Sequence, residues 1–275
     1  MHTIKCPVLL VHGWKSNPKI WNELISQLNA EEIPFWNFSH TGMKDSEPCY
    51  ISKELLQFIK NMQNKTGYFG QFDIICHSLG TSIVRYMAEV LDGESKELKI
   101  RQIIAIGPPN QGSAMAELFN HPLHGPEIIS KLSGLFVPKR YEPEKDKLVQ
   151  EIRPGSRTLA EIERAGIRDD VRYRLILGMN KTETPEFFPC FEGKTWELRE
   201  NNEWTQTIRG DGIIPLSDSY LQGAGYDVFP SDSKQLFPEN AGSYCHLYLP
   251  QNPEIIKRII QYLSDPETKS FNYFH

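Results

Sequence analysis

Apolar residues in the first 110 positions occur in two patterns that follow one another along the chain. Short continuous runs, rich in Val, Ile, Leu and Phe, are typical of strands buried on both faces of a parallel sheet, and they lie at 7–11, 33–38, 72–75 and 100–107. Between these runs, apolar side chains at helical spacing predict helices at 20–28, 52–62 and 81–88. Strands that alternate with helices indicate βαβ units, so the sequence predicts an α/β fold with a mostly parallel central sheet.

The alternation breaks near residue 111, and strand character returns at 173–178. Within the break, an apolar stripe with helical spacing ends at Phe136, and a second helical pattern covers 157–165. We therefore expect the segment of roughly 111–170 to form a helical cap or lid over one edge of the sheet, within a single domain spanning 1–275.

The remainder of the chain has a weaker pattern. The segment after Gly178 is rich in charged residues, Asn and Trp, and predicts no clear element. A last helix is expected to begin at Asn252 and Pro253, because isoleucines recur at helical spacing after them. The tail beyond Asp265 is expected to be peripheral.

Composition narrows the classes of protein and of partner. The chain has 275 residues, of which 39% are hydrophobic and 24% charged, and this balance argues against disordered and fibrous classes. The net charge is −5 without clustered Lys or Arg, so no nucleic-acid partner is expected. We also expect no transmembrane segment, since no apolar run is long enough. Nothing in the composition indicates the oligomeric state.

The cysteines bear on localisation. There are five of them, an odd number, and they show no CxxC pattern, which favours reduced thiols in a cytoplasmic protein. The first residues lead straight into an apolar strand without a long hydrophobic leader. A secreted protein whose signal peptide has been removed is the alternative.

One turn carries a candidate nucleophile. The sequence Cys76-His77-Ser78-Leu79-Gly80 lies between the predicted strand at 72–75 and the predicted helix at 81–88. A strand, a sharp turn bearing serine and a helix are the context that a nucleophile elbow requires. The residues around the serine must be small, and Gly80 satisfies this, whereas Cys76 stands where glycine is usual. The alternative interpretation is an ordinary loop serine.

Chain order indicates the base that would activate this serine. In hydrolases with this type of sheet, the order is serine, acid, histidine. Four histidines precede Ser78, His121 and His124 lie in the predicted insertion, and His275 is the last residue. His246, just before the last helix, remains as the candidate base.

Four aspartates between Tyr173 and His246 are candidates for the acid that orients this base. Asp211 is preferred, because glycines flank it and Ile213 and Ile214 follow, which suits a carboxylate on a tight loop at a strand end. The alternatives, in order of preference, are Asp218, Asp227 and Asp232. A Gly-Asp-Gly sequence is also compatible with a simple turn.

An acyl-transfer site also needs donors for the oxyanion of its tetrahedral intermediate. One candidate is the backbone N–H of Leu79, directly after Ser78. The other is the backbone N–H of Trp14, in the loop after the first strand, where Gly13 lets the backbone turn inward. The Trp14 indole is expected to shape the wall of the substrate pocket.

Taken in order, these segments resemble the α/β-hydrolase superfamily, and more narrowly its bacterial lipase-like and esterase branch. The stretches that carry the resemblance are spread over nearly the whole chain: 11–14, 76–80, 107–113, 154–156, 210–215, and His246 with the helix after it. The resemblance implies a mostly parallel sheet with flanking helices and a lid, and hydrolysis of carboxylic esters through an acyl-enzyme. It also implies Ser78 as nucleophile, Asp211 as acid and His246 as base, with Trp14 and Leu79 at the oxyanion positions.

The expected substrate is a small-molecule or lipid acyl ester. Leu132, Leu135 and Phe136 of the predicted cap are candidates to face the acyl group, in addition to packing in the core. No cofactor and no metal are expected, because no carboxylate or His/Cys cluster has ligand spacing. The competing hypotheses are a thioesterase or acyltransferase with the same three residues, and a hydrolase-fold binding protein without catalysis.

Overall fold

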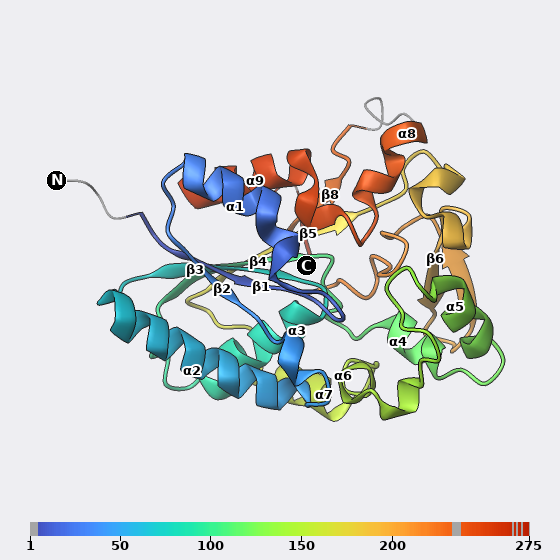
Figure 1. Ribbon diagram of the computed structural model, residues 1–275, viewed down its shortest axis with the longest axis horizontal. Helices are drawn as coiled ribbons and strands as arrows, with labels where there is room; N and C mark the ends of the chain where they lie inside the picture. The colour runs from blue at the N-terminus through green and yellow to red at the C-terminus, as the bar shows by residue number, and fades with distance from the viewer. Residues whose placement is uncertain (1–4, 233–237, 266, 268, 271, 275) are drawn as a thin grey trace.

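A seven-stranded sheet forms the centre of the protein, in the order β2-β1-β3-β4-β5-β8-β9 (Figure 1). The computed structural model describes residues 5–232, 238–265, 267, 269–270 and 272–274. The strands are β1 (Val8–Val11), β2 (Phe35–Phe38), β3 (Phe72–His77), β4 (Ile100–Ile106), β5 (Arg172–Gly178), β8 (Gly225–Phe229) and β9 (Asn272–Tyr273). Neighbouring strands from β2 to β8 pair in parallel, and β9 pairs antiparallel with β8.

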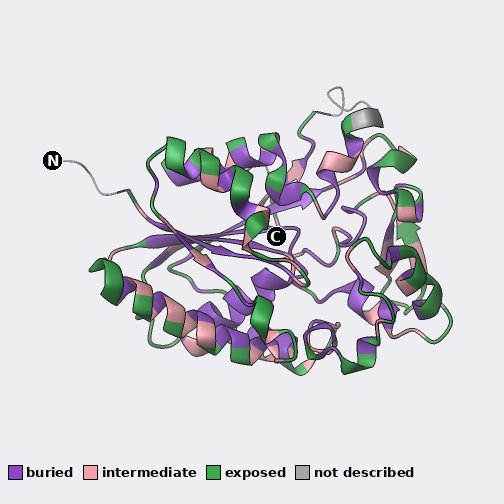
Figure 2. Cartoon of the chain, viewed as in Figure 1, coloured by how far each residue is buried: buried purple, intermediate pink, exposed green. Residues whose placement is uncertain are grey.

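Helices cover both faces of this sheet. One face carries α1 (Asn22–Ala30) and α9 (Pro253–Ser264), and the other carries α2 (Pro48–Thr66), α3 (Leu79–Arg85), the π-helical turn η3 (Tyr86–Leu91) and α7 (Arg157–Ala165). Figure 2 shows the strands buried between helices whose outward faces are exposed. Because both faces are covered, every residue of β1 and β3 is buried, as the continuous apolar runs predict.

The predicted elements are present, with shifted bounds. The helix α2 starts four residues before the predicted Ser52, because Pro48 fits the first helical turn, and it ends where Gly67 adopts a left-handed φ of 70°. The predicted helix after the elbow divides into α3 and η3. The tail is not wholly peripheral, since β9 adds an edge strand there; a two-residue strand is too short to leave a periodic pattern.

The helices of the segment between β4 and β5 do not all pack at the same place on the sheet. At the edge where the parallel strands have their carboxyl ends lie α4 (Ala114–Phe119), α5 (Gly125–Leu132) and α6 (Lys147–Gln150). In contrast, α7 packs along the flank of the sheet against η3, where Leu159 and Ile162 meet Tyr86 in a small separate cluster. Of the expected cap at 111–170, the part up to α6 thus lies at the sheet edge and α7 lies elsewhere.

The segment after β5, for which the sequence predicts no element, supplies an antiparallel hairpin at the same edge, β6 (Thr195–Leu198) and β7 (Trp204–Thr207). The short helix α8 (Pro238–Ala241) follows β8. Short 3-10 turns lie at η1 (Pro18–Trp21), η2 (Thr41–Met43), η4 (Pro143–Lys145), η5 (Pro185–Phe187), η6 (Pro189–Phe191), η8 (Gly242–Tyr244) and η9 (Leu249–Gln251). In the part of the chain that the structure describes, no helix combines the length and apolar character needed to cross a membrane.

Candidate active site

The turn between β3 and α3 holds Ser78 in an unusual backbone conformation. Its φ is 53° and its ψ is −128°, a combination that side-chain-bearing residues rarely adopt. Two backbone hydrogen bonds hold the turn: the Ser78 N–H donates to Ile106 O at 3.0 Å, and the Thr81 N–H donates to Ser78 O at 2.9 Å. The conformation is the one expected of a nucleophile elbow, in which strain presents the hydroxyl at the top of the sheet.

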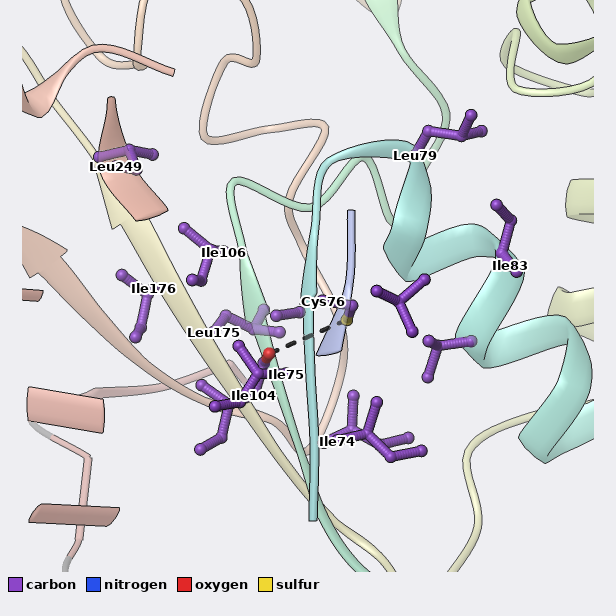
Figure 3. Close-up of a cluster of buried hydrophobic side chains, with 14 of the residues drawn as sticks. Ile74, Ile75, Cys76, Leu79, Ile83, Ile104, Ile106, Leu175, Ile176 and Leu249 are labelled. Carbon is purple, nitrogen blue, oxygen red and sulfur yellow. Dashed lines mark hydrogen bonds between the residues drawn. The ribbon is translucent and has the colours of Figure 1, made fainter. Parts of the chain in front are cut away.

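Cys76, which replaces the usual glycine, fits beneath this turn. Its side chain is fully buried among apolar side chains of β3, β4 and β5 (Figure 3). The thiol donates to Thr81 Oγ1 at 3.5 Å and lies 3.8 Å from Ile104 O. Burial raises the pKa of Cys76 to about 12, so the thiol stays neutral at physiological pH. The thiol acts as a small core side chain, and the elbow forms without the first glycine.

The structure brings Ser78, His246 and Asp211 together in one line of hydrogen bonds. His246 Nε2 lies 2.9 Å from Ser78 Oγ, and His246 Nδ1 lies 2.7 Å from Asp211 Oδ2. Both the imidazole and the carboxylate are buried, whereas Ser78 is partly exposed. A carboxylate on Nδ1 fixes the tautomer that leaves Nε2 free to accept the serine proton.

Asp211 is held by its own loop. Its Oδ1 accepts hydrogen bonds from the amides of Ile213, at 3.0 Å, and Ile214, at 2.7 Å, which leaves Oδ2 for the histidine. The backbone also joins the two residues, because the His246 N–H donates to Asp211 O at 2.8 Å. The neighbouring Gly212 N–H donates to Thr195 Oγ1 of β6 at 2.8 Å. The carboxylate is therefore positioned before any substrate arrives.

Two glycines at the ends of β4 and β5 make room for this pair. At Gly107, which has a φ of 54°, a Cβ atom would stand 2.9 Å from both Asp211 Oδ2 and His246 Nδ1. At Gly178 a Cβ atom would stand 2.8 Å from Asp211 Cβ. Both distances are too short for a real Cβ, so only glycine allows the histidine and aspartate to meet here. No local sequence pattern indicates this steric requirement at either glycine.

His77 lies beside the candidate base. Its ring centroid is 4.7 Å from that of His246, and its Nε2 lies 3.0 Å from the His246 backbone oxygen, to which it donates. Burial, with a smaller contribution from His246, holds the pKa of His77 well below its ordinary value. A neutral His77 places no charge beside the His246 ring.

The loop after β1 passes directly over Ser78. A Cβ atom on Gly13 would stand 2.9 Å from Ser78 Cβ, so the close approach of this loop requires glycine. Leu79 is the first residue of α3, and its N–H is one of the first-turn amides that have no acceptor within the helix. The two residues expected to supply the oxyanion donors therefore adjoin Ser78 along the chain: Leu79 follows it, and Trp14 follows Gly13 in the loop that approaches it.

A cavity of about 380 Å³ opens at Ser78 and His246. Its volume is within the range of small-molecule sites. Most of its inner wall is apolar and comes from the segment between β4 and β5 and from the Asp211 loop, at Met115, Ala116, Phe119, Phe136, Val149, Ile152, Ile213 and Ile214. Lys15, Lys19 and Gln251 are among its polar lining residues.

The structure separates the three cap residues that were candidates for the acyl pocket. Phe136 lines the cavity, and so does the Trp14 side chain. Leu132 is fully buried in the core at the end of α5, and Leu135 is 48% exposed; neither lines the cavity. Helical spacing places residues on one face, but α5 ends at Leu132, so the stripe does not continue through Leu135.

The alternative acids lie in other interactions. Asp218 is buried and accepts the Ala114 N–H at 2.7 Å, at the start of α4. Burial raises the pKa of Asp218 to about 8, so it is mostly protonated at neutral pH. Asp227 pairs with Arg258 of α9 at 2.7 Å and accepts a hydrogen bond from the Tyr262 hydroxyl. Asp232 is exposed. The structure thus favours Asp211 as the partner of His246.

Sequence reasoning also missed Asp146, which contacts the indole of Trp14. The available signal was an aspartate two positions before the apolar pair Leu148 and Val149, a pattern typical of a helix N-cap. His275, considered among the histidines, lies outside the described residues. Within the described ranges, no three His, Cys, Asp or Glu side chains are grouped so as to hold a metal ion.

Comparisons with known proteins place the fold. No protein-family model matches the chain, and no curated protein matches it. The lipase BlEst2 from Bacillus licheniformis, in its mature form, is 14% identical with a TM-score of 0.66, over 94% of this chain and 92% of that chain. The product of the gene lin2722 from Listeria innocua is 16% identical with a TM-score of 0.54, over 98% and 97% of the two chains.

A third solved structure, the metagenomic carboxyl esterase MGS0156, is 15% identical with a TM-score of 0.53, over 97% of this chain and 77% of that chain. The chain therefore has the α/β-hydrolase fold, and the expected fold class is confirmed. The expected resemblance to lipases and esterases is confirmed at the level of fold.

Proposed function

We propose that this protein is a serine hydrolase that cleaves carboxylic esters through an acyl-enzyme intermediate. The observation that carries the proposal is the line from Ser78 Oγ to His246 Nε2, at 2.9 Å, and from His246 Nδ1 to Asp211 Oδ2, at 2.7 Å, at the mouth of an apolar cavity. The lipases and esterases among the similar folds support the same reaction.

In the first half of the reaction, Ser78 Oγ attacks the ester carbonyl carbon while its proton passes to His246 Nε2. Asp211 stabilises the resulting imidazolium through Nδ1. The negative charge on the former carbonyl oxygen is held by the amides of Trp14 and Leu79. The intermediate then expels the alcohol, which takes its proton from His246 Nε2, and the acyl group remains on Ser78.

In the second half, water attacks the acyl-enzyme carbonyl and gives a proton to His246 Nε2. The second tetrahedral intermediate releases the carboxylic acid, and His246 returns the proton to Ser78 Oγ. The apolar wall with Phe136 would hold the acyl chain. The segment from α4 to α6 would serve as the cap, since it supplies most of that wall.

The proposal is tested with a fluorophosphonate probe and with p-nitrophenyl esters of increasing acyl length. The wild-type protein should be labelled on Ser78, and Ser78→Ala should be neither labelled nor active. The order of chain lengths then shows how long an acyl group the cavity accepts. A wild-type protein that is not labelled and hydrolyses no ester or matched thioester faster than Ser78→Ala would rule out this function.

A further inference from the structure

One carboxylate ties the loop after β1 to the segment between β4 and β5. Asp146 is buried directly before α6, and its Oδ2 accepts a hydrogen bond from Trp14 Nε1 at 3.0 Å and lies 3.2 Å from Lys15 Nζ. Its Oδ1 accepts the amides of Leu148, at 3.2 Å, and Val149, at 3.3 Å. Oδ1 therefore caps the N-terminus of α6, and Oδ2 binds the loop that passes over Ser78.

This loop needs to be held from outside. It is a tight turn in which the Ser16 N–H donates to Gly13 O at 3.4 Å, with Trp14 and Lys15 at its tip. Lys15 has a φ of 50°, a left-handed conformation that is unfavourable for a residue with a side chain. Such a conformation persists only where surrounding contacts hold it. Asp146 contacts the side chains of both tip residues.

Aromatic packing complements this contact. The Trp14 ring lies 5.5 to 6.1 Å, between centroids, from the rings of Phe119, Phe136 and Tyr141, all from the segment between β4 and β5. These ring contacts are apolar and tilted or edge-on, so they place the indole without binding its N–H group. The hydrogen bond from Nε1 to Asp146 adds a directional contact, because it fixes the position of one edge of the indole.

We propose that Asp146 is a positioning residue for the oxyanion site, which fixes the Trp14 backbone N–H in front of Ser78 by holding the Trp14 and Lys15 side chains. The inference rests on the proposed function, in which that N–H stabilises the oxyanion. An oxyanion donor is effective because it is oriented before charge develops. Because Asp146 itself does not line the cavity, its replacement releases the loop and slows acyl transfer without removing a group from the acyl wall.

Two variants remove the hydrogen bond between Trp14 and Asp146, one by changing its acceptor and the other by changing its donor. In Asp146→Asn, the amide oxygen can still begin α6, while the amide nitrogen replaces the acceptor of the Trp14 N–H. Trp14→Phe keeps an aromatic ring and removes the donor. We expect each variant to lower kcat for p-nitrophenyl butyrate by roughly 10- to 100-fold, as for a misplaced catalytic group. In Asp146→Asn, which alters no residue that lines the cavity, KM should change less than threefold, whereas Trp14→Phe alters a lining residue and is compared by kcat alone. The double variant should be no more than threefold slower than Asp146→Asn alone, because Asp146→Asn already breaks the contact that Trp14→Phe removes.

Glu142→Gln is the matched control, since this nearby exposed carboxylate pairs with the exposed Lys145 and does not line the cavity, so the change should leave kcat unchanged. All rates are normalised to active sites titrated with the fluorophosphonate probe. Losses that multiply in the double variant, or a raised KM with unchanged kcat, would overturn the inference. A lower urea midpoint with unchanged kcat would do the same, because it would make Asp146 merely structural. A wild-type protein with no esterase activity would instead refute the proposed function, and the two failures are thus distinguishable.

Discussion

Replacing Asp211 with asparagine tests the assignment of the acid most directly. The carboxylate divides its oxygens between Oδ1, which accepts the amides of Ile213 and Ile214, and Oδ2, which faces His246 Nδ1. In Asp211→Asn the amide oxygen is expected to keep the two backbone contacts, because an NH₂ group there would meet two donors. The NH₂ group then faces His246 Nδ1.

This orientation reverses the histidine tautomer. Nδ1 must accept a hydrogen bond from the asparagine NH₂ group, so Nε2 carries the ring proton and cannot accept one from Ser78. The equivalent loss in serine proteases lowers kcat by about 10⁴, or roughly 5 kcal/mol in the activation free energy. We expect a fall of about this size in Asp211→Asn, with KM changed less than threefold, because Asp211 does not line the cavity.

The assay is steady-state hydrolysis of p-nitrophenyl butyrate at pH 7, with urea unfolding to confirm that the variant is folded. Asp218→Asn is the matched control. That carboxyl is buried, its pKa is raised to about 8, and asparagine has the shape of its protonated form. Its kcat should stay within about threefold of wild type. A loss of less than tenfold in Asp211→Asn, or a loss in Asp218→Asn as large as that expected for Asp211, would refute the reasoning.

Two further predictions concern stability. Cys76→Gly should lower the free energy of unfolding by about 2 kcal/mol, because it leaves a cavity in the core and adds the backbone entropy of glycine. Its kcat per folded molecule should stay within threefold of wild type. Urea unfolding measures the stability and titrated activity measures kcat, and a folded but inactive variant would contradict the prediction. Burial and the neighbouring His40 lower the pKa of His12 from 6.5 to about 4. The unfolded chain therefore binds the proton first as pH falls, and the His12 contribution to stability, present above pH 6.5, should decrease by about 2 kcal/mol between pH 7 and pH 5. An equally steep pH dependence of urea unfolding in His12→Asn would show that His12 is not its source.

The parts of the protein that could be predicted from sequence are those with a local signal. Buried parallel strands appear as continuous apolar runs, so the sheet from β1 to β5 follows from the pattern. Ser78 lies in a turn that needs small neighbours, and the position of His246 before the last helix follows from chain order. Asp211 was preferred among four candidates from its flanking glycines and the isoleucines after it, and its contact with His246 separates it from Asp218 and Asp227 in the structure.

The remaining features depend on contacts between segments far apart in sequence. Gly107 is required because Asp211 and His246, from loops distant in sequence, lie where a Cβ atom would stand. No local sequence pattern predicts that close approach. Asp146 reaches Trp14 across 132 positions of sequence. The same limit explains Leu135, which shares the apolar character of Phe136 but lies outside the cavity, because the direction of the chain after α5 is set by tertiary packing.

The backbone at Ser78 has a consequence for the evolution of this chain. A positive φ in a residue with a side chain costs on the order of 1–3 kcal/mol, and glycine would relieve most of it. Selection for stability alone would therefore oppose serine at the one position where the proposed chemistry requires it. Serine at this position thus lowers stability while the proposed activity requires it. The buried core around β3 and β4 supplies the stability that lets the chain retain a serine there.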